Sequence, residues 1–157
     1  MNPKVYIETS VVSYYAGRGS RDVVIAGRQQ STQDFWLLLA DVILPFVSAL
    51  VVKEAARGNS VVAKKRLEAI RAFPVLGTTP EAERLAQALI DARGIPTECP
   101  EDALHIAVAA IAGMDFIVTW NFSHINNPFT KMMIRQAVEN VGYECPEIVS
   151  PDAFLGD

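Results

Sequence analysis

The segment at residues 100–125 constrains the fold most, because it joins an apolar helix to a continuous hydrophobic strand. Residues 100–112 place apolar side chains, many of them Ala, on almost every side of a helix that Gly113 closes. A helix of this kind is buried and packs closely against its neighbours. Residues 114–119 follow with Phe116, Ile117 and Val118 in a row, which is typical of a parallel strand covered on both faces. The segment therefore predicts a layered fold around a buried parallel sheet.

The rest of the chain repeats this alternation of strands and helices. We expect strands at residues 5–7, 43–47, 74–77, 114–119 and 147–149, and helices at 11–15, 22–42, 49–57, 61–73, 81–93, 100–112 and 129–141. Strict alternation indicates βαβ units with right-handed crossovers. We therefore predict a three-layer α/β/α sandwich with a central parallel sheet of four to five strands, formed by residues 1–157 as a single domain. Pro45 indicates an edge position or an early kink in the second strand, and Thr9 or Ser10 is expected to cap the helix at 11–15.

Composition excludes several classes of protein. The formal net charge of -4 argues against a protein that coats nucleic acid by bulk electrostatics, although not against an enzyme that acts on it. The two cysteines, Cys99 and Cys145, form no C-x-x-C pair and are expected to be reduced thiols. From the first residues we expect no signal peptide, and the longest apolar run, residues 106–114, is too short to span a bilayer. We expect a cytoplasmic protein with no membrane partner.

Four polar side chains lie at junctions between strands and helices. Glu8 follows the first strand, Glu54 lies beside the apolar face of the helix after the second strand, Asp102 is in the first turn of the Ala-rich helix, and Asn121 follows the strand at 114–119. Because ligands bind open parallel sheets at the carboxyl ends of the strands, these side chains are expected to converge there. Taken singly, Asp102 is also explained by the helix dipole, Glu54 by a surface ion pair and Asn121 by a turn.

Carboxylates brought together repel one another, and a hard cation is the usual remedy. Oxygen ligands favour Mg²⁺ or Mn²⁺, which can activate water against a phosphodiester. A nucleotide-binding loop is absent from the sequence, and the histidines lack the matching pair of cysteines for zinc. We interpret His105 as a partly buried structural residue. His124 is either an ordinary loop residue or a residue that contacts phosphate or donates a proton.

Basic residues cluster in two places. Arg18 and Arg21 lie in a flexible loop, and Lys53 and Arg57 belong to a basic helical region that continues with Lys64, Lys65, Arg66 and Arg71. This region is either a solvated helix face or a rim that contacts phosphates, and the sequence favours neither.

The polar motifs, in their order along the chain, resemble those of the PIN-domain ribonucleases, and more narrowly the VapC-type toxins of type II toxin–antitoxin systems. The motifs are Glu8-Thr9-Ser10, Glu54, Asp102-Ala-Leu-His-Ile-Ala and Thr119-Trp-Asn-Phe. The family usually carries Asp after the first strand and Thr-x-Asp after the later one, so Glu8 and Asn121 depart from its pattern. Glu8 is one methylene longer than Asp, and Asn121 keeps an oxygen but loses the charge.

The resemblance implies a Mg²⁺- or Mn²⁺-dependent endoribonuclease that leaves 5′-phosphate and 3′-hydroxyl ends. Glu8, Glu54, Asp102 and Asn121 would hold the metal, the hydroxyls of Thr9 and Thr119 would position them, and His124 would support them. Arg18, Arg21, Lys53 and Arg57 would contact RNA. A small antitoxin protein and a homodimer are the implied partners. The alternative, which the departures at Glu8 and Asn121 favour, is a catalytically degenerate PIN fold that binds RNA or a protein.

Overall fold

The computed structural model describes residues 2–156, and a five-stranded parallel sheet lies at its centre. The strands are β1 (Lys4–Ile7), β2 (Leu44–Ser48), β3 (Val75–Leu76), β4 (Phe116–Val118) and β5 (Glu147–Val149). Their order is β3-β2-β1-β4-β5, and every neighbouring pair is parallel. The predicted α/β class with a parallel sheet between helices is confirmed.

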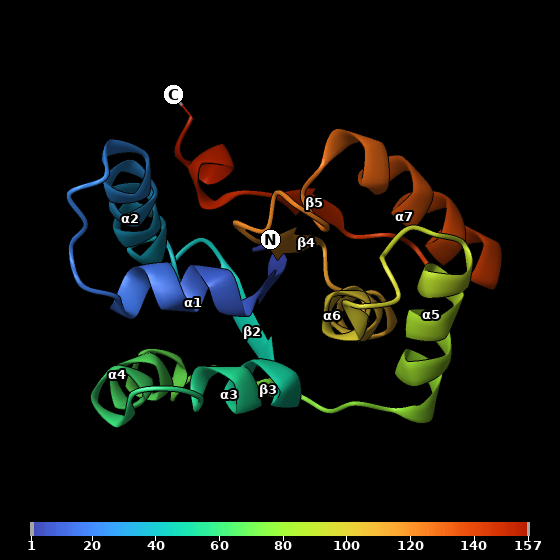
Figure 1. Cartoon of the computed structure of the whole chain (residues 1–157), viewed down its shortest axis with the longest axis horizontal. Coiled ribbons are helices and arrows are strands. Elements are labelled where there is room, and N and C mark those ends of the chain that lie inside the picture. The colour runs from blue at the N-terminus through green and yellow to red at the C-terminus, as the bar shows by residue number, and fades with distance from the viewer. Residues whose placement is uncertain (1, 157) are drawn as a thin grey trace.

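Two groups of helices pack on the two sides of this sheet (Figure 1). One group contains α1 (Thr9–Ala16), α2 (Val23–Trp36), α3 (Ala49–Ala55) and α4 (Ser60–Ile70), with the 3-10 helix η1 (Pro151–Leu155) against α2. The other contains α5 (Pro80–Asp91), α6 (Pro100–Ile111) and α7 (Pro128–Val141). Among the described residues, none of the helices is both long and apolar enough to cross a membrane.

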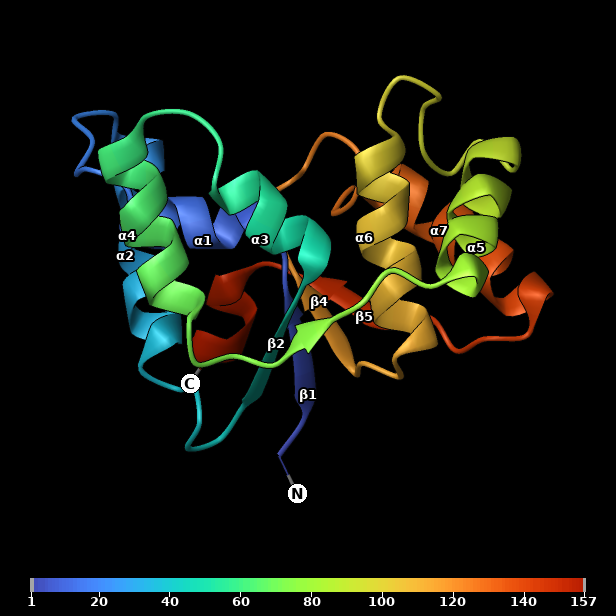
Figure 2. The ribbon, with the colours of Figure 1, turned by 90° about the horizontal axis from the view of Figure 1, so that it is seen from below.

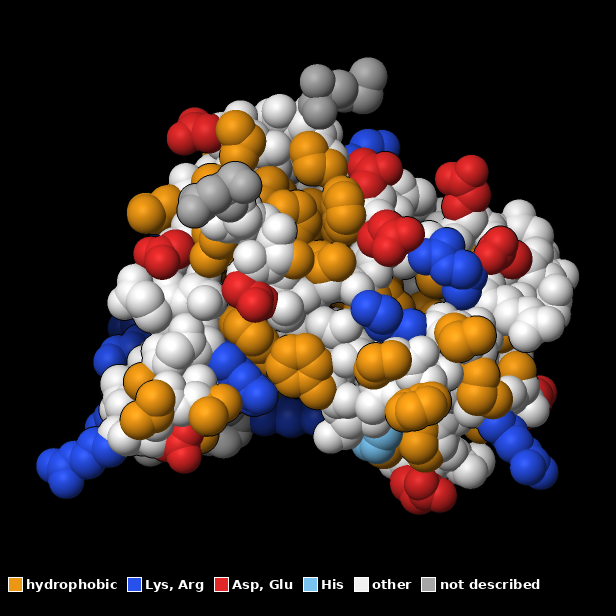
Figure 3. Space-filling view, turned by 90° about the horizontal axis from the view of Figure 1, so that it is seen from above, with side chains coloured by type: hydrophobic (Ala, Val, Ile, Leu, Met, Phe, Trp, Pro, Cys, Tyr) orange, Lys and Arg blue, Asp and Glu red, His pale blue; other side chains and the backbone are white. Residues whose placement is uncertain are grey.

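The strand order places a switch point between β1 and β4. The chain leaves β1 towards β2 and β3, and then crosses to β4 and β5 on the other side of β1. Connections therefore diverge at the carboxyl ends of β1 and β4, which is where ligands bind in sheets of this type. In Figure 2, β1 runs from the N-terminus up between the two groups of helices, with α3 on one side and α6 on the other. A space-filling view shows the surface indented between the two groups of helices (Figure 3).

The segment from which the fold was predicted lies in the core. Helix α6 buries Ala103 and every residue from His105 to Ala110. β4 pairs with β1 on one side, with Tyr6 opposite Ile117, and with β5 on the other. Both predicted features, the buried helix and the doubly covered strand, are confirmed.

Two local predictions are wrong, and a third, on Pro45, is confirmed. The helix expected at residues 22–42 ends at Trp36, because the chain turns back through Ala40, whose φ is 74°. Pro45 does lie at a local edge position, although β2 as a whole lies between β1 and β3. The β2–β3 pairing begins only at Val47, so the missing N–H of Pro45 faces a side with no partner strand there. Finally, the cap of α1 is the Glu8 side chain rather than Thr9 or Ser10.

Candidate acidic active site

Glu8 is fixed at the junction of β1 and β4. Its backbone N–H donates to the Val118 carbonyl at 3.1 Å. Its Oε1 accepts hydrogen bonds from the Ser10 and Thr119 hydroxyls, both at 2.5 Å, and its Oε2 accepts the Ser10 backbone N–H at 3.1 Å. The side chain is only 6% exposed. The first predicted acid thus stands at the switch point, with its orientation set by its own helix and by the end of β4.

The two hydroxyls that donate to Glu8 are themselves held by the backbone of the loop after β4. Ser10 Oγ accepts the Trp120 N–H at 2.9 Å, and Thr119 Oγ1 accepts the Asn121 N–H at 2.9 Å. Each hydroxyl has one proton, which it directs to Glu8 while it receives a backbone donor. The carboxylate therefore ties the start of α1 to the loop that carries Asn121.

Glu54 forms a hydrogen bond with a buried histidine, His105, and both lie close to Glu8. Its Oε1 accepts from the Thr9 hydroxyl at 2.6 Å and from His105 Nε2 at 2.7 Å. One ligand atom each from Glu8, Glu54 and His105 lie within 4.8 Å of one another. His105 is 1% exposed, and its Nδ1 lies 2.6 Å from the Tyr6 hydroxyl. Helix α3 thus presents Glu54 to the same point that β1 reaches with Glu8.

The electrostatics of this pair favour a charged contact. Burial opposes ionisation of Glu54, but the hydrogen bond and charge of His105 outweigh burial and hold the pKa of Glu54 below its usual value. Burial also favours a neutral His105, yet the Glu54 hydrogen bond and the charges of Glu8, Glu54 and Asp102 raise its pKa. Burial raises the pKa of the Tyr6 hydroxyl, so Tyr6 stays neutral. An ionised Glu54 only accepts hydrogen bonds, and His105 therefore carries its proton on Nε2.

Asp102 and Asn121 meet at His124 rather than at Glu8 or Glu54. Asp102 Oδ2 lies 2.9 Å from His124 Nδ1, and Asn121 Oδ1 accepts the His124 backbone N–H at 3.0 Å. Asp102 is still close enough to the group of Glu8, Glu54 and His105 for its charge to raise the pKa of His105, which lies on the next turn of α6. The four predicted residues thus form two adjoining pairs at one end of the sheet, joined by the Thr119–Asn121 link and by α6.

The donor set fits a hard divalent cation. Within residues 2–156, no hydrogen bond reaches Glu54 Oε2 or Asp102 Oδ1, and no Lys or Arg forms a salt bridge with Glu8, Glu54 or Asp102. Carboxylate oxygens without a cationic partner are the ligands that Mg²⁺ and Mn²⁺ take in proteins. Asn121 is less available as a ligand, because its amide oxygen already holds the His124 loop.

The predicted basic residues are all exposed. Arg18 and Arg21 lie in the loop between α1 and α2, and Lys53 lies on α3 with Arg57 just after it. Arg57 is close enough to Glu54 for its charge to lower the pKa of that carboxyl.

Sequence reasoning missed another basic residue, Arg28 of α2. Its guanidinium lies 5.1 Å from the Phe122 ring centroid and 5.7 Å from that of Trp120, and Phe122 is 40% exposed. Both aromatic residues flank Asn121 in the loop after β4. A cation and an exposed ring thus lie together beside the acidic groups, a combination that suits contact with a nucleotide.

Sequence reasoning also assigned no partners to three residues at the site. Ser10 was expected only as a possible helix cap, His105 only as a structural histidine, and Cys99 only as a free thiol. Cys99 is indeed free and half-buried, and burial together with the charges of Asp102, Glu98 and Glu101 raises its pKa. The i, i+3 spacing of Asp102 and His105 was the available signal, since it places both on one side of α6.

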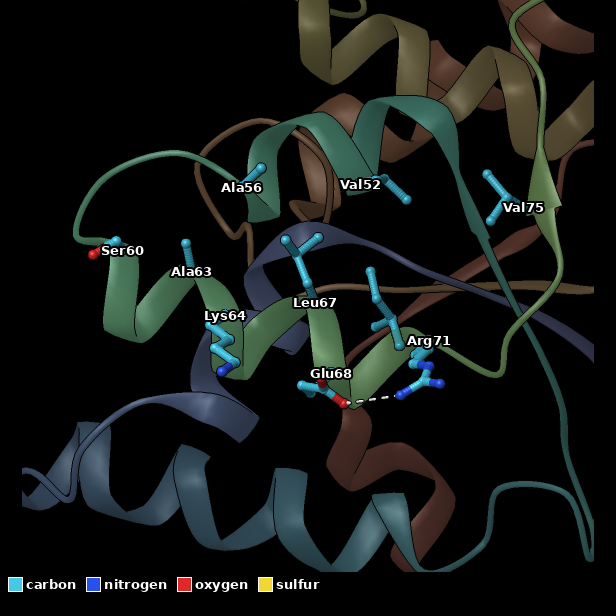
Figure 4. Close-up of a pocket in the computed structure, with 10 residues that line it drawn as sticks. Val52, Ala56, Ser60, Ala63, Lys64, Leu67, Glu68, Arg71 and Val75 are labelled. Carbon is cyan, nitrogen blue, oxygen red and sulfur yellow. Dashed lines mark ion pairs between the residues drawn. The ribbon is translucent and has the colours of Figure 1, made fainter.

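An apolar hollow lies apart from the acidic groups. It measures about 570 Å³ and lies between α3, α4 and β3, with Val52, Ala56, Leu67 and Val75 among its lining (Figure 4). Lys64, Glu68 and Arg71 border it, and the last two form an ion pair at 3.7 Å. Glu54 is not part of its lining, so α3 contributes separate residues to the apolar hollow and to the acidic site.

Comparison with known proteins supports the fold. No protein-family model and no curated protein matches the sequence. Among solved structures, the chain is similar to one in the crystal structure of VapBC2 from Rickettsia felis bound to a DNA fragment from their promoter. The TM-score is 0.56 at 14% sequence identity, over 76% of this chain and 89% of that chain. At this identity the likeness shows the fold alone, and it agrees with the five-stranded parallel sheet on which the acidic groups lie.

Proposed function

We propose that this chain is a divalent-cation-dependent endoribonuclease whose site comprises Glu8, Glu54 and Asp102. The observation that carries the proposal is the meeting of Glu8 and Glu54 at the switch point of the sheet, with ligand atoms within 4.8 Å of His105 and of each other. Asp102 lies one helical turn before His105 and adds the third carboxylate. Asn121 serves as an organiser of the adjoining loop.

The chain's own residues have separable tasks in this proposal. Thr119 and Ser10 orient Glu8, while Thr9 and His105 orient Glu54. Bound Mg²⁺ or Mn²⁺ would supply positive charge to the phosphodiester and lower the pKa of a water molecule. His124, which is partly exposed and faces Asp102, is placed to donate a proton or a hydrogen bond to a phosphate oxygen.

RNA binding in this proposal uses cations that surround the carboxylates. Arg28 with Phe122 offers a cation and a ring face beside the loop after β4, and Arg57 lies near Glu54. Lys53, Arg18 and Arg21 extend the positive charge along α3 and the loop between α1 and α2. Phosphate contacts of this kind hold the backbone without reading the sequence of bases.

The test is RNA cleavage by purified protein with Mn²⁺, with Mg²⁺ and with EDTA. Wild type should cleave only with a divalent cation, and Glu54→Gln and Asp102→Asn should each lose about 100-fold or more, since even an outer partner of a metal ligand is worth 10- to 100-fold. Glu83→Gln, an exposed acid on α5, is the matched control. Equal rates in all variants would contradict the proposal.

A second candidate, a non-catalytic RNA-binding module, is favoured by the engagement of the Asn121 oxygen with His124. It predicts RNA binding in a gel shift that does not change between EDTA and Mn²⁺, and no cleavage. Metal-dependent turnover would exclude it.

The proposal includes a small antitoxin protein as partner and a homodimer as the form of the free chain. The likeness to a VapBC2 chain supports the first. Co-expression with any short open reading frame directly upstream, followed by tag purification, tests it, and a co-purified protein should suppress cleavage. Light scattering of the purified chain measures its mass, and a monomer at all concentrations would contradict the homodimer.

A further inference from the structure

A cluster at the start of α6 offers a ligand type that the carboxylate site lacks. The Cys99 thiol, the Asp102 carboxylate and the His124 imidazole each provide one ligand atom, all within 4.8 Å of one another. The Cys99 carbonyl accepts the Asp102 N–H at 3.1 Å, so both residues belong to one turn. His124 comes from the loop between β4 and α7. Three ligands from two segments therefore converge beside the helix.

The loop that carries His124 is held in place before any ligand binds. The His124 N–H donates to Asn121 Oδ1 at 3.0 Å, and its carbonyl accepts the Thr130 hydroxyl at 2.9 Å. The imidazole Nδ1 lies 2.9 Å from Asp102 Oδ2. Fixed backbone on both sides of the ring keeps it turned towards Asp102 and Cys99, which lowers the entropy that ligand binding costs.

The chemistry of this set differs from that of Glu8 and Glu54. Sulfur and imidazole ligands select borderline-soft cations such as Zn²⁺, whereas Mg²⁺ takes oxygen ligands. Bonds of about 2.0–2.3 Å place the ligand atoms of a tetrahedral zinc site roughly 3.3–3.8 Å apart. The separations here, from 2.9 Å up to no more than 4.8 Å, reach those values through shifts of side chains alone. A fourth position would remain for water or a substrate atom.

We propose that Cys99, Asp102 and His124 form a binding site for Zn²⁺ or a similar borderline-soft divalent cation. On binding, the thiol releases its proton to solvent, and His124 binds through a deprotonated Nδ1, so affinity rises with pH. Asp102 takes part through Oδ2, while its Oδ1 faces no described donor. Zn²⁺ would therefore draw the Asp102 charge away from Glu8 and Glu54 and slow RNA cleavage. That consequence rests on the proposed function, but the binding itself does not.

Titration with Co²⁺, a spectroscopic substitute for Zn²⁺, tests the site directly. A thiolate ligand gives a sulfur-to-cobalt charge-transfer absorption in the near ultraviolet, which oxygen ligands do not give. We expect the absorption in wild type and its loss in Cys99→Ser. Serine is a favoured residue at the cap of a helix, so this variant keeps α6 intact. Cys145→Ser, which replaces the other free thiol, is the matched control and should keep the absorption.

Calorimetry with Zn²⁺ gives the second measurement. One Zn²⁺ should bind per chain, and Cys99→Ser and His124→Ala should each weaken binding by about 100-fold or more. Glu54→Gln should leave both readings unchanged, which separates this site from the proposed nuclease site. No charge-transfer absorption in wild type, its persistence in Cys99→Ser, or equal loss in Cys145→Ser would each overturn the assignment.

Discussion

Tyr6→Phe tests whether a buried hydrogen-bond network supports the acidic site. The Tyr6 hydroxyl lies 2.8 Å from Ser48 Oγ and 2.6 Å from His105 Nδ1, and all three side chains are at most 1% exposed. Through His105 Nε2 the network reaches Glu54. The substitution keeps the ring and removes only the hydroxyl, so any effect comes from the hydrogen bonds.

The expected loss of stability follows from the two contacts. A buried hydrogen bond contributes about 1 kcal/mol, and a buried partner left without one costs about 1–3 kcal/mol. His105 Nδ1 is left without a partner, whereas Ser48 Oγ loses one bond but still accepts the Val51 N–H at 3.2 Å. Together these losses give about 2–4 kcal/mol in the free energy of unfolding. For a chain of this size that corresponds to a fall in Tm of roughly 5–15 °C.

Urea unfolding followed by circular dichroism measures the change, with Tyr143→Phe as the matched control. Among the described residues the Tyr143 hydroxyl has no hydrogen-bond partner, so its removal should change the free energy by less than about 0.5 kcal/mol. A Tyr6→Phe loss no larger than this control would refute the account of the network. The double variant with Ser48→Ala should show a coupling of about 0.5–3 kcal/mol.

Three further predictions concern the same site. In EDTA, the Glu54–His105 contact should stabilise the fold most between pH 4.5 and 6.5, the ordinary pKa values of the two groups. The pKa of Glu54 is lowered, so its contribution is lost as pH falls below this window, and the pKa of His105 is raised, so its contribution is lost as pH rises above it. His105→Gln should remove the loss at high pH in urea titrations, and an unchanged profile would contradict this. Ser10→Ala removes a donor to Glu8 and should weaken Mn²⁺ binding by about 10- to 100-fold in calorimetry, whereas an unaltered affinity would show that the hydroxyl does not orient the carboxylate. Asn121→Asp should lower Tm in EDTA and raise the stabilisation that Mn²⁺ gives above the wild-type value, and equal stabilisation would argue against a cation near that loop.

The sheet was predictable because its signal is local. A strand covered on both faces is a short apolar run, and Phe116–Val118 shows one within three residues. The end of α2 was not predictable in this way. Leu38 and Leu39 continue the apolar pattern past Trp36, and the turn depends on the positive φ of Ala40. Because residues other than Gly rarely adopt positive φ, an Ala in the sequence does not predict such a turn.

The acidic site was only partly predictable, because its partners are distant in the chain. Positions of Glu8 and Glu54 followed from the ends of strands, but the role of His105 depends on Tyr6, 99 residues earlier, and on Glu54, 51 residues earlier. Arg28 likewise meets Phe122 only because α2 packs beside the loop after β4. Neither contact leaves a periodic pattern in the sequence.

The two departures from the PIN pattern have different consequences once their contacts are known. The longer side chain of Glu8 is accommodated without a change elsewhere in the site. It turns back to cap α1 and accepts hydrogen bonds from the Ser10 and Thr119 hydroxyls at the end of β4. Asn121 instead holds the His124 N–H, and so fixes the loop that faces Asp102. An amide does this without adding a fourth negative charge to three carboxylates that already lie close together. In the proposed function the carboxylates are therefore those of Glu8, Glu54 and Asp102, and an amide at position 121 does not by itself argue against that function.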